Sequence, residues 1–284
     1  MKPCLASSYL QLDETPIKEL APGTGKTRTG YVWVLNDPCP GCSVSYRWQN
    51  GRSRKDLDQA LGKYAENWKG IFQSDRYSVY PSYQRDHSEL IKLGSGMTHI
   101  RRGFTKALDA EDRDAARIVR LISDLYQIEE DLRQEKAGPA LRDATRASHR
   151  APRLRLIRRY LEKIKSRHFP KSLMGQAICY ALNHWSGLDC YLADGRVELC
   201  KNLCENAIRP LKIGAKNYLF FGSRRGCELG GVADTLIENG KRHGLDLRAN
   251  LIETMKALVE HGPSRAAELT PAAFVKARRF AKAS

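Results

Sequence analysis

The stretch YVWVLNDPCPGCSVSYRW, residues 31–48, sets the character of the first hundred residues. Its two ends, residues 31–35 and 43–48, are rich in the β-branched and aromatic side chains that favour strands. Pro-Gly between them is typical of a tight turn, so the stretch predicts a β-hairpin. Cys39 and Cys42 have the spacing of half a zinc site, but the sequence offers no second CxxC or His pair to complete one.

Short apolar runs on either side of this hairpin continue the strand pattern. Residues 9–13 form one run and residues 70–74 another, and each ends at or directly before an acidic residue. Residues 89–93 predict a fifth strand, whereas residues 54–68 carry Leu and Tyr at helical spacing. Strands interrupted by a helix in this way predict a domain of the α+β class.

The middle of the chain, from residue 100 to about residue 185, has helical periodicity. One apolar stripe covers residues 118–132, and a second covers residues 154–164. Residues 150–171 hold nine Lys and Arg against a single Glu. A helix so strongly basic favours contact with phosphates, and an ordinary solvated face is the alternative.

The rest of the chain predicts further helices, so the C-terminal part is expected to be helical. A glycine-rich loop is expected between residues 222 and 231, and a polar, basic tail after residue 262. The helices are expected over residues 172–193, 197–212, 231–242 and 248–261.

The composition indicates a polyanionic partner. With 48 Lys and Arg against 32 Asp and Glu, the 284-residue chain has a formal charge of +16, which favours nucleic acid. A basic protein that merely stays soluble is the alternative. The apolar runs are too short to span a bilayer, and the N-terminus lacks the apolar stretch of a secretory signal. Since eight cysteines in a chain of this length do not indicate a disulfide framework, we expect a cytoplasmic protein without membrane contact.

The segment PGTGKT, residues 22–27, has a partial likeness to a phosphate-binding loop. The first glycine of that motif falls on Leu20, and the residues after the segment predict a strand instead of the helix that such a loop needs. A turn is therefore the favoured interpretation.

Three acidic residues are candidate metal ligands, although position alone gives each an ordinary alternative. Asp13 and Asp75 lie at or just beyond the ends of predicted strands, where neighbouring carboxylates repel unless a cation such as Mg²⁺ lies between them. A turn residue or a helix cap is the usual role of such an Asp. Glu205 shares a helix face with Lys201 and Arg209, which suits a ladder of ion pairs. The packing face of that helix is predicted to consist of Leu199, Leu203, Ala207 and Leu211.

Seven segments, in order along the chain, resemble the transposases of insertion sequence family 66, a branch of the Asp-Asp-Glu transposases. The last two are the most specific, and the collinear succession of all seven over most of the chain is highly specific. The segments are LDET (12–15), TGYVWV (29–34), FQSDRYSVY (72–80), HIRR followed by Phe104 (99–104), ISDLYQIEEDLR (122–133), ENAIRPLKIGAKNYLFFGS (205–223) and LIENGKRHGLD (236–246).

The resemblance implies an RNase-H-like fold: a mixed sheet of the α+β (α/β) class, a large α-helical insertion and a helical C-terminal part. It implies that Asp13, Asp75 and Glu205 are the catalytic residues and hold two Mg²⁺ ions, for which Mn²⁺ can substitute. The implied reaction is hydrolysis of a strand at the transposon end, followed by attack of the freed 3′-hydroxyl on target DNA.

The resemblance also implies DNA contacts and a division of the chain. We expect the RNase-H-like domain over residues 1–104 and 172–262, the insertion over residues 105–171 and a basic tail over residues 263–284. His99 is a candidate for assisting the reaction, with a structural role as the alternative. The candidates for phosphate contacts are Arg101, Arg102, Arg209, Lys216, Arg158 and Arg159.

The chain departs from the family pattern just before Glu205. Cys200, Lys201 and Asn202 stand where the family usually has Asp-Asn-Asn, so a cation replaces a neutral residue one turn before the Glu. Lys201 could compete with a metal ion for the carboxylate. The family's N-terminal zinc-binding and DNA-binding segments do not precede Asp13, which indicates a truncated copy.

Three other functions remain open on the sequence. The chain could be a DNA-binding remnant without catalysis, an RNase-H-like nuclease that does not join strands, or a basic helical interaction module. The last leaves the segments around Asp13 and Asp75 unexplained. For a transposase, the expected partners are double-stranded DNA of the transposon ends and target, further copies of the chain, and accessory proteins of the same element. The expected location is the cytoplasm, at the nucleoid when the protein is on DNA.

Overall fold

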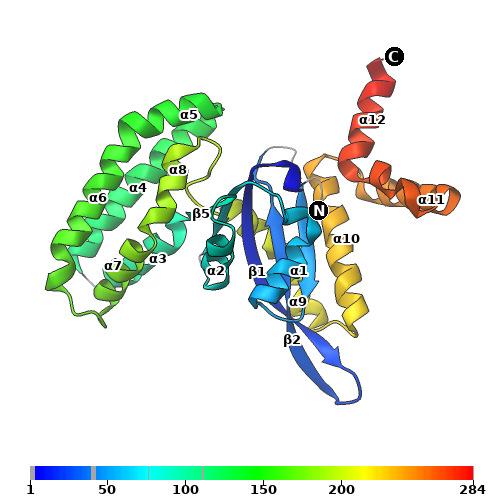
Figure 1. Ribbon diagram of the computed structural model, residues 1–284, viewed down its shortest axis with the longest axis horizontal. Helices are drawn as coiled ribbons and strands as arrows, with labels where there is room; N and C mark the ends of the chain where they lie inside the picture. The colour runs from blue at the N-terminus through cyan, green and yellow to red at the C-terminus, as the bar shows by residue number, and fades with distance from the viewer. Residues whose placement is uncertain (1–3, 40–42, 76, 111, 284) are drawn as a thin grey trace. The chain divides into compact units, whose positions relative to one another are not determined.

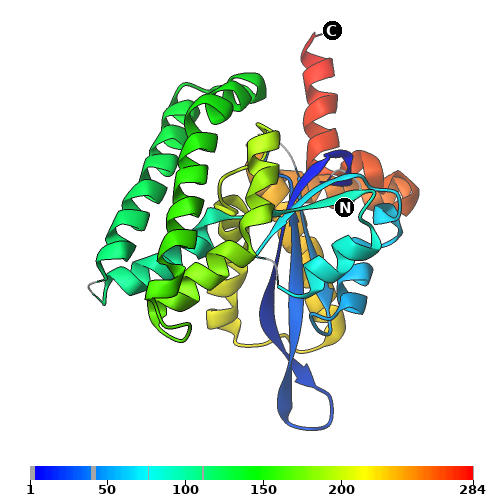
Figure 2. The same cartoon turned by 60° about the vertical axis from the view of Figure 1, so that its left-hand side comes forward.

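The chain divides into two compact units in a computed structural model (Figure 1; Figure 2). Unit 1 consists of Met1–Trp68 and Leu203–Ser284, and unit 2 consists of the intervening Lys69–Asn202. The chain therefore leaves unit 1 once and returns to it at the start of a helix. The structure describes residues 4–39, 43–75, 77–110 and 112–283.

Unit 1 is built on three antiparallel strands, β1 (Tyr9–Ala21), β2 (Lys26–Asn36) and β3 (Val44–Gln49). Strand β2 lies between the other two and pairs with each of them. The pairing of β2 with β3 confirms the two strands predicted around Pro-Gly. The turn predicted there falls on residues 40–42, which lie outside the described residues.

The PGTGKT segment forms the hairpin between β1 and β2, which confirms the turn. Gly23 and Gly25 have φ values of 74° and 64°, in the left-handed region that favours glycine. Strand β2 begins at Lys26, so the segment leads into a strand instead of the helix that a phosphate-binding loop requires.

Asp13 lies inside β1, which corrects the prediction that the strand ends at this residue. The strand continues because alternate side chains after Asp13 still point inward, and Thr15, Ile17 and Glu19 are buried. The residues between them are exposed and include Pro16. A proline and two buried polar residues interrupt the apolar run, so a search for apolar residues found only the first part of the strand.

The helices of unit 1 are α1 (Arg54–Leu61), α9 (Asn202–Tyr218), α10 (Arg224–Arg242), α11 (Leu247–His261) and α12 (Pro271–Ala283). The apolar residues of α9 and α10 form one buried cluster with inward side chains of the three strands. The Tyr46 hydroxyl on β3 donates to the backbone carbonyl of Ala207 on α9 at 2.7 Å. The core of unit 1 therefore lies between the strands and α9.

The glycine-rich stretch predicted as a loop belongs to α10, which corrects that prediction. Ser223 caps the helix by accepting the backbone N–H of Gly226 at 3.1 Å. A Cβ at Gly231 would stand 3.1 Å from the carbonyl oxygen of Tyr46 on β3. Glycine is needed here because the helix approaches the strand so closely, and composition alone does not distinguish this use from a loop.

Unit 2 opens with two parallel strands, β4 (Gly70–Ser74) and β5 (Ile91–Ser95), joined through α2 (Val79–Asp86). Together with the antiparallel strands of unit 1, this pair confirms the α+β class. The helices that follow confirm the α-helical insertion between Asp75 and Glu205. They are α3 (Met97–Leu108), α4 (Arg113–Gln134), α5 (Pro139–Thr145), α6 (Ala151–Ile164), α7 (Leu173–Asn183) and α8 (Asp189–Ala193).

Several helical segments differ from the sequence prediction. The helix expected over residues 54–68 ends at Leu61, because Gly62 has a φ of 60° and breaks the helical path. The helix expected over residues 172–193 is interrupted after Asn183. The tail after residue 262 is largely helical. None of the helices in the described ranges is long and apolar enough to cross a membrane.

A buried carboxylate, Glu129, organises the helical bundle of unit 2. Its oxygens accept hydrogen bonds from Arg142 at 2.6 Å, from Arg146 at 3.0 Å and from the Tyr191 hydroxyl at 2.7 Å. Arg150 also pairs with Glu129, and both Arg146 and Arg150 are fully buried. Arg150 opens the basic run that was predicted to contact phosphates, so this residue belongs to the interior of the bundle.

Candidate active site

Asp13 faces the side of the strands that α9 covers. Because side chains alternate along a strand, Asp13 points the same way as Gln11 and Ile17. Ile17 belongs to the buried cluster that includes α9, and Gln11 bonds to the same helix. The Asp13 carboxylate is half-buried, and its Oδ1 accepts the backbone N–H of Glu14 at 3.0 Å.

The first turn of α9 is fixed to β1 by Gln11. Gln11 Oε1 accepts the backbone N–H of Cys204 at 3.1 Å, and the Gln11 carbonyl accepts the Cys204 thiol at 3.8 Å. Asn36 Nδ2 donates to Gln11 Oε1 at 3.3 Å, and Arg242 Nη2 donates to Asn36 Oδ1 at 2.7 Å. Since Glu205 directly follows Cys204, its carboxylate is carried by the helix turn that rests on β1.

The position of Glu205 in the first turn of α9 suits a carboxylate, because the positive end of the helix dipole favours negative charge there. The prediction that Leu199 and Leu203 belong to the packing face of this helix is wrong. Leu203 is 44% exposed, and Leu199 precedes the helix. The helix starts later than predicted, and the buried side chains on it are Cys204, Ala207, Ile208 and Leu211.

Asp75 lies in unit 2, directly after β4. The strands β4 and β5 are parallel, with Ser74 opposite Ser95, so their carboxyl ends meet at one edge. Asp75 Oδ1 accepts the backbone N–H of Tyr77 at 3.0 Å. The carboxyl edge of parallel strands is where open α/β sheets generally bind ligands.

The segment that leads into α9 runs along this edge within unit 2. Gln73 Nε2 donates to the carbonyl of Glu198 at 2.7 Å and to that of Ser95 at 3.3 Å. The backbone N–H of Met97 donates to the carbonyl of Leu199 at 2.8 Å. These bonds tether the chain beside Asp75 just before it passes into unit 1.

Lys201 ends this tethered segment and is only 2% exposed. A Cβ at Gly96 would stand 3.6 Å from the backbone nitrogen of Lys201, so Lys201 lies at the edge that carries Asp75. Lys201 precedes α9, so it does not share a helix face with Glu205, which corrects the predicted ladder. A buried ammonium group is costly unless polar or negatively charged groups surround it.

Comparison with known proteins identifies the family. The model of the transposase IS66 family matches residues 1–229. The chain belongs to this family.

Three curated relatives of this IS66-family chain come from Sinorhizobium fredii. "Uncharacterized protein y4jD" is 29% identical over 259 residues, which cover 87% of this chain and 49% of the relative. "Uncharacterized protein y4qI" is 30% identical over 266 residues, or 89% of this chain and 48% of the relative. "Uncharacterized protein y4hP" is 26% identical over 288 residues, or 94% and 50%. The chain thus spans about half the length of these relatives, and no solved structure matches it.

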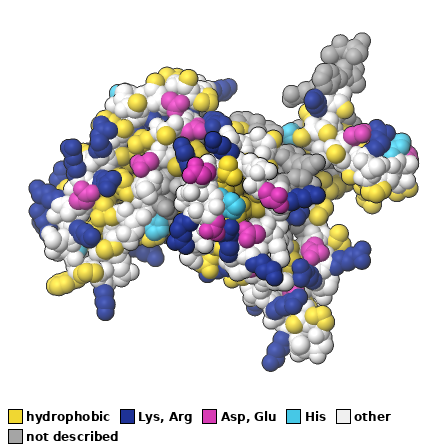
Figure 3. All heavy atoms as spheres, viewed as in Figure 1, with side chains coloured by type: hydrophobic (Ala, Val, Ile, Leu, Met, Phe, Trp, Pro, Cys, Tyr) yellow, Lys and Arg dark blue, Asp and Glu magenta, His cyan; other side chains and the backbone are white. Residues whose placement is uncertain are grey.

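The basic residues predicted to contact phosphates are exposed in this IS66-family chain. Arg158 on α6 is 55% exposed and pairs with Glu162 at 3.0 Å. Figure 3 shows Lys and Arg side chains gathered at the left-hand edge, where Figure 1 draws α6. The exposed candidates are Arg101 and Arg102 on α3, Arg158 and Arg159 on α6, and Arg209 and Lys216 on α9.

Unit 2 also contains an Asp-Asp-His cluster that sequence reasoning missed. One ligand atom from each of Asp112, Asp114 and His168 lies within 4.8 Å of the others, a spacing that a metal ion could bridge. Asp114 is already bonded to the Tyr160 hydroxyl at 2.6 Å and to His168 at 3.1 Å. These bonds join the start of α4 to the end of α6, so a structural role accounts for the cluster.

Proposed function

We propose that this chain is the catalytic part of a transposase that cleaves DNA at insertion-sequence ends and joins the freed strand to target DNA. Asp13, Asp75 and Glu205 are its catalytic carboxylates. The observation that carries the proposal is the bonding of Gln11 to Cys204, because it fixes the turn bearing Glu205 on the strand bearing Asp13.

Asp75 completes the proposed set from unit 2. Support comes from the path of the chain: residues 198–201 are tethered at the edge that carries Asp75, and Glu205 follows four positions after Lys201. Such a short connection limits how far Glu205 can lie from that edge, since each extended residue spans about 3.5 Å.

The three residues fit a pair of divalent cations, because carboxylate oxygens are the ligands that Mg²⁺ and Mn²⁺ prefer. When bound, two such ions supply positive charge at the attacking and leaving oxygens of an in-line displacement. The chain itself fixes the carboxylates through Gln11 and through the parallel strands, and exposed arginines on α3 and α9 hold the DNA phosphates.

The proposal is tested by incubating the protein with duplex transposon-end DNA and a target duplex in Mg²⁺ or Mn²⁺. The unsubstituted chain nicks the end and forms joined product, and Asp75→Asn lowers nicking by about 10³-fold, or about 4 kcal/mol of barrier. Asp124→Asn, on the exposed face of α4, is the matched control and retains activity. DNA binding without any nicking by the unsubstituted chain would overturn the catalytic assignment, and nicking without joining would indicate a nuclease.

A DNA-binding remnant without catalysis is the second candidate, and the burial of Lys201 supports it. Lys201 is a buried cation whose backbone lies beside Gly96, just after β5, and a cation close to a metal-binding carboxylate weakens metal binding. Either function takes double-stranded DNA as its partner. We further propose that the protein acts in the cytoplasm on the nucleoid, as a multimer with accessory proteins of its element.

A further inference from the structure

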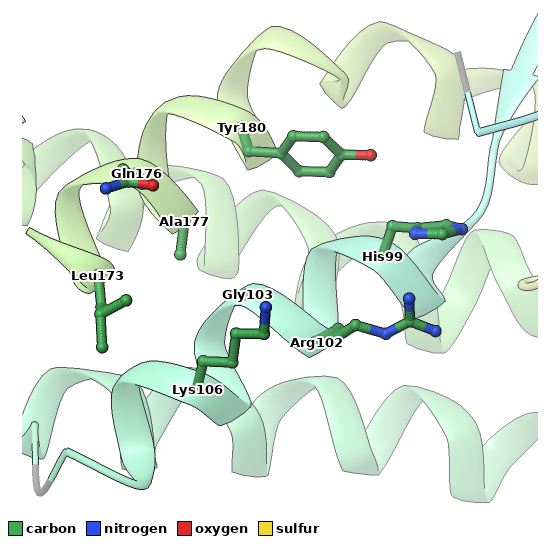
Figure 4. Close-up of a pocket in the computed structure, with 8 residues that line it drawn as sticks. All are labelled: His99, Arg102, Gly103, Lys106, Leu173, Gln176, Ala177 and Tyr180. Atoms are coloured by element: carbon green, nitrogen blue, oxygen red, sulfur yellow. The ribbon is translucent and has the colours of Figure 1, made fainter. Parts of the chain in front are cut away.

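Unit 2 contains a basic hollow between α3 and α7. Its volume is about 350 Å³, within the range of small-ligand sites. Figure 4 shows His99, Arg102 and Lys106 on α3 below Gln176 and Tyr180 on α7, whose side chains extend in opposite directions. The hollow is therefore walled by cationic groups on one helix and by an amide and an aromatic ring on the other.

Small residues at the helix contact create this hollow. A Cβ at Gly103 would stand 3.2 Å from the Cβ of Ala177, so the two helices approach closely at its floor. The larger side chains one turn away, such as Tyr180, remain as walls. Leu173, 50% exposed, adds apolar surface at the rim. The space is thus built into the packing of α3 on α7.

The charge of the hollow is unbalanced. Arg102 and Lys106 are exposed, and within the described ranges neither makes an ion pair with a carboxylate. They lie four positions apart, on the same side of α3. Two cations facing a hollow without Asp or Glu in its lining favour a phosphate group.

The opposite wall suits a nucleobase. Tyr180 is half-buried and stacks on His184 with ring centroids 4.0 Å apart, so its ring is held in place. A fixed aromatic ring is a platform for an unpaired base, and the Gln176 amide offers a donor and an acceptor for a base edge. Paired bases inside a duplex could not enter such a hollow.

We propose that the hollow between α3 and α7 binds one unpaired nucleotide of the DNA, with its phosphate on Arg102 and Lys106 and its base on Tyr180. The inference rests on the proposed function, because it takes DNA as the substrate. It adds that two helices of unit 2 capture a nucleotide outside the double helix, so the protein prefers ends with unpaired bases.

Binding in EDTA tests this separately from catalysis. Fluorescence anisotropy is measured with a labelled oligo-dT of about ten nucleotides and with a fully paired duplex of the same length. Tyr180→Ala weakens oligo-dT binding about tenfold and leaves duplex binding within about twofold, whereas Tyr180→Phe retains the affinity. Lys106→Ala lowers the slope of log affinity against log salt by about one for oligo-dT.

Lys256→Ala on α11 is the matched control, since it removes one exposed helical lysine outside the hollow. Lys106 is exposed, so Lys106→Ala tests the site even if Tyr180→Ala fails to fold. The proposal is overturned if Lys106→Ala changes oligo-dT binding no more than Lys256→Ala does. It is also overturned if folded Tyr180→Ala loses duplex and oligo-dT binding equally, or loses neither. Binding in EDTA requires neither metal nor strand cleavage, so a failure of catalysis and a failure of the hollow give different results.

Discussion

One polar network in each unit shows a different way of holding interior polar groups. In unit 1, neutral amides hold the start of α9 on β1, since Gln11 bonds Cys204 and Asn36 bonds Gln11. In unit 2, charges hold the bundle together, with Glu129 accepting from Arg142 and Arg146. A neutral anchor would not compete with metal ions at the proposed site, whereas a buried ion network depends on every member. The difference predicts that losing one member of the network costs more stability in unit 2 than in unit 1.

The largest expected effect is a loss of stability when the buried ion network of unit 2 is broken. Glu129→Gln leaves Arg146 and Arg150 buried without their carboxylate, which destabilises the protein by about 3–5 kcal/mol. Urea unfolding measures the loss, and hydrogen exchange locates it in the amides of unit 2. Glu130→Gln, at a carboxylate 47% exposed, is the control and should cost far less. Equal losses for both variants would contradict the buried network.

Removing the Gln11 side chain from unit 1 should lower the stability less than Glu129→Gln does, but it should lower strand cleavage more. Gln11→Ala leaves the Cys204 N–H and the Asn36 amide without their acceptor, at about 1–3 kcal/mol. Because the turn bearing Glu205 loses its support on β1, strand cleavage should fall by at least about tenfold at a temperature where the variant stays folded. The exposed Gln134→Ala is the control. Unchanged cleavage in folded Gln11→Ala would show that the bond does not position Glu205.

Two glycines of α10, Gly231 and Gly226, test how closely this helix packs on β3. Gly231→Ala places a Cβ 3.1 Å from the carbonyl oxygen of Tyr46, which cannot easily move, and should destabilise by about 1–3 kcal/mol. Gly226→Ala makes ordinary contacts with the Ser223 hydroxyl at 3.4 Å and the Phe221 ring at 3.9 Å, and should be neutral or slightly stabilising. Thermal unfolding distinguishes the two, and a greater loss for Gly226→Ala would contradict the packing.

The smallest expected effect is a pH dependence in unit 2. The hydrogen bond from the Tyr160 hydroxyl, together with His168, holds the pKa of Asp114 below its ordinary value of 3.8. A depressed pKa contributes stability that is present above the ordinary value and is lost as the pH falls through the folded value. Below about pH 4, the free energy of unfolding should therefore fall less steeply with decreasing pH in Asp114→Asn than in Asp124→Asn. Identical slopes for the two variants would show that Asp114 does not contribute to the pH dependence of stability.

Sequence patterns predicted much of the fold. The amphipathic helices α4 and α6 were found because their buried residues repeat at helical spacing, and the hairpins because of their turn residues. The full length of β1 and the helical state of residues 224–231 were missed. Thr15 and Glu19 are buried polar residues within β1, and Gly231 is required by a contact with β3 that lies far away in the sequence.

The candidate site was predictable only in part. Asp13, Asp75 and Glu205 were selected through the family resemblance, because each has an ordinary role in its local pattern. The Gln11 anchor, the burial of Lys201 and the hollow near Tyr180 depend on contacts between distant segments. Spacing along one element cannot reveal such contacts.

The most direct test of the central claim is affinity cleavage of the protein backbone by bound Fe²⁺ with ascorbate and peroxide. Iron in the proposed site should cut the chain beside all three carboxylates, Asp13, Asp75 and Glu205, and excess Mg²⁺ should suppress the cuts. Cuts confined to Asp112 and His168, or the absence of cuts near Asp75, would contradict a catalytic site formed from these three residues.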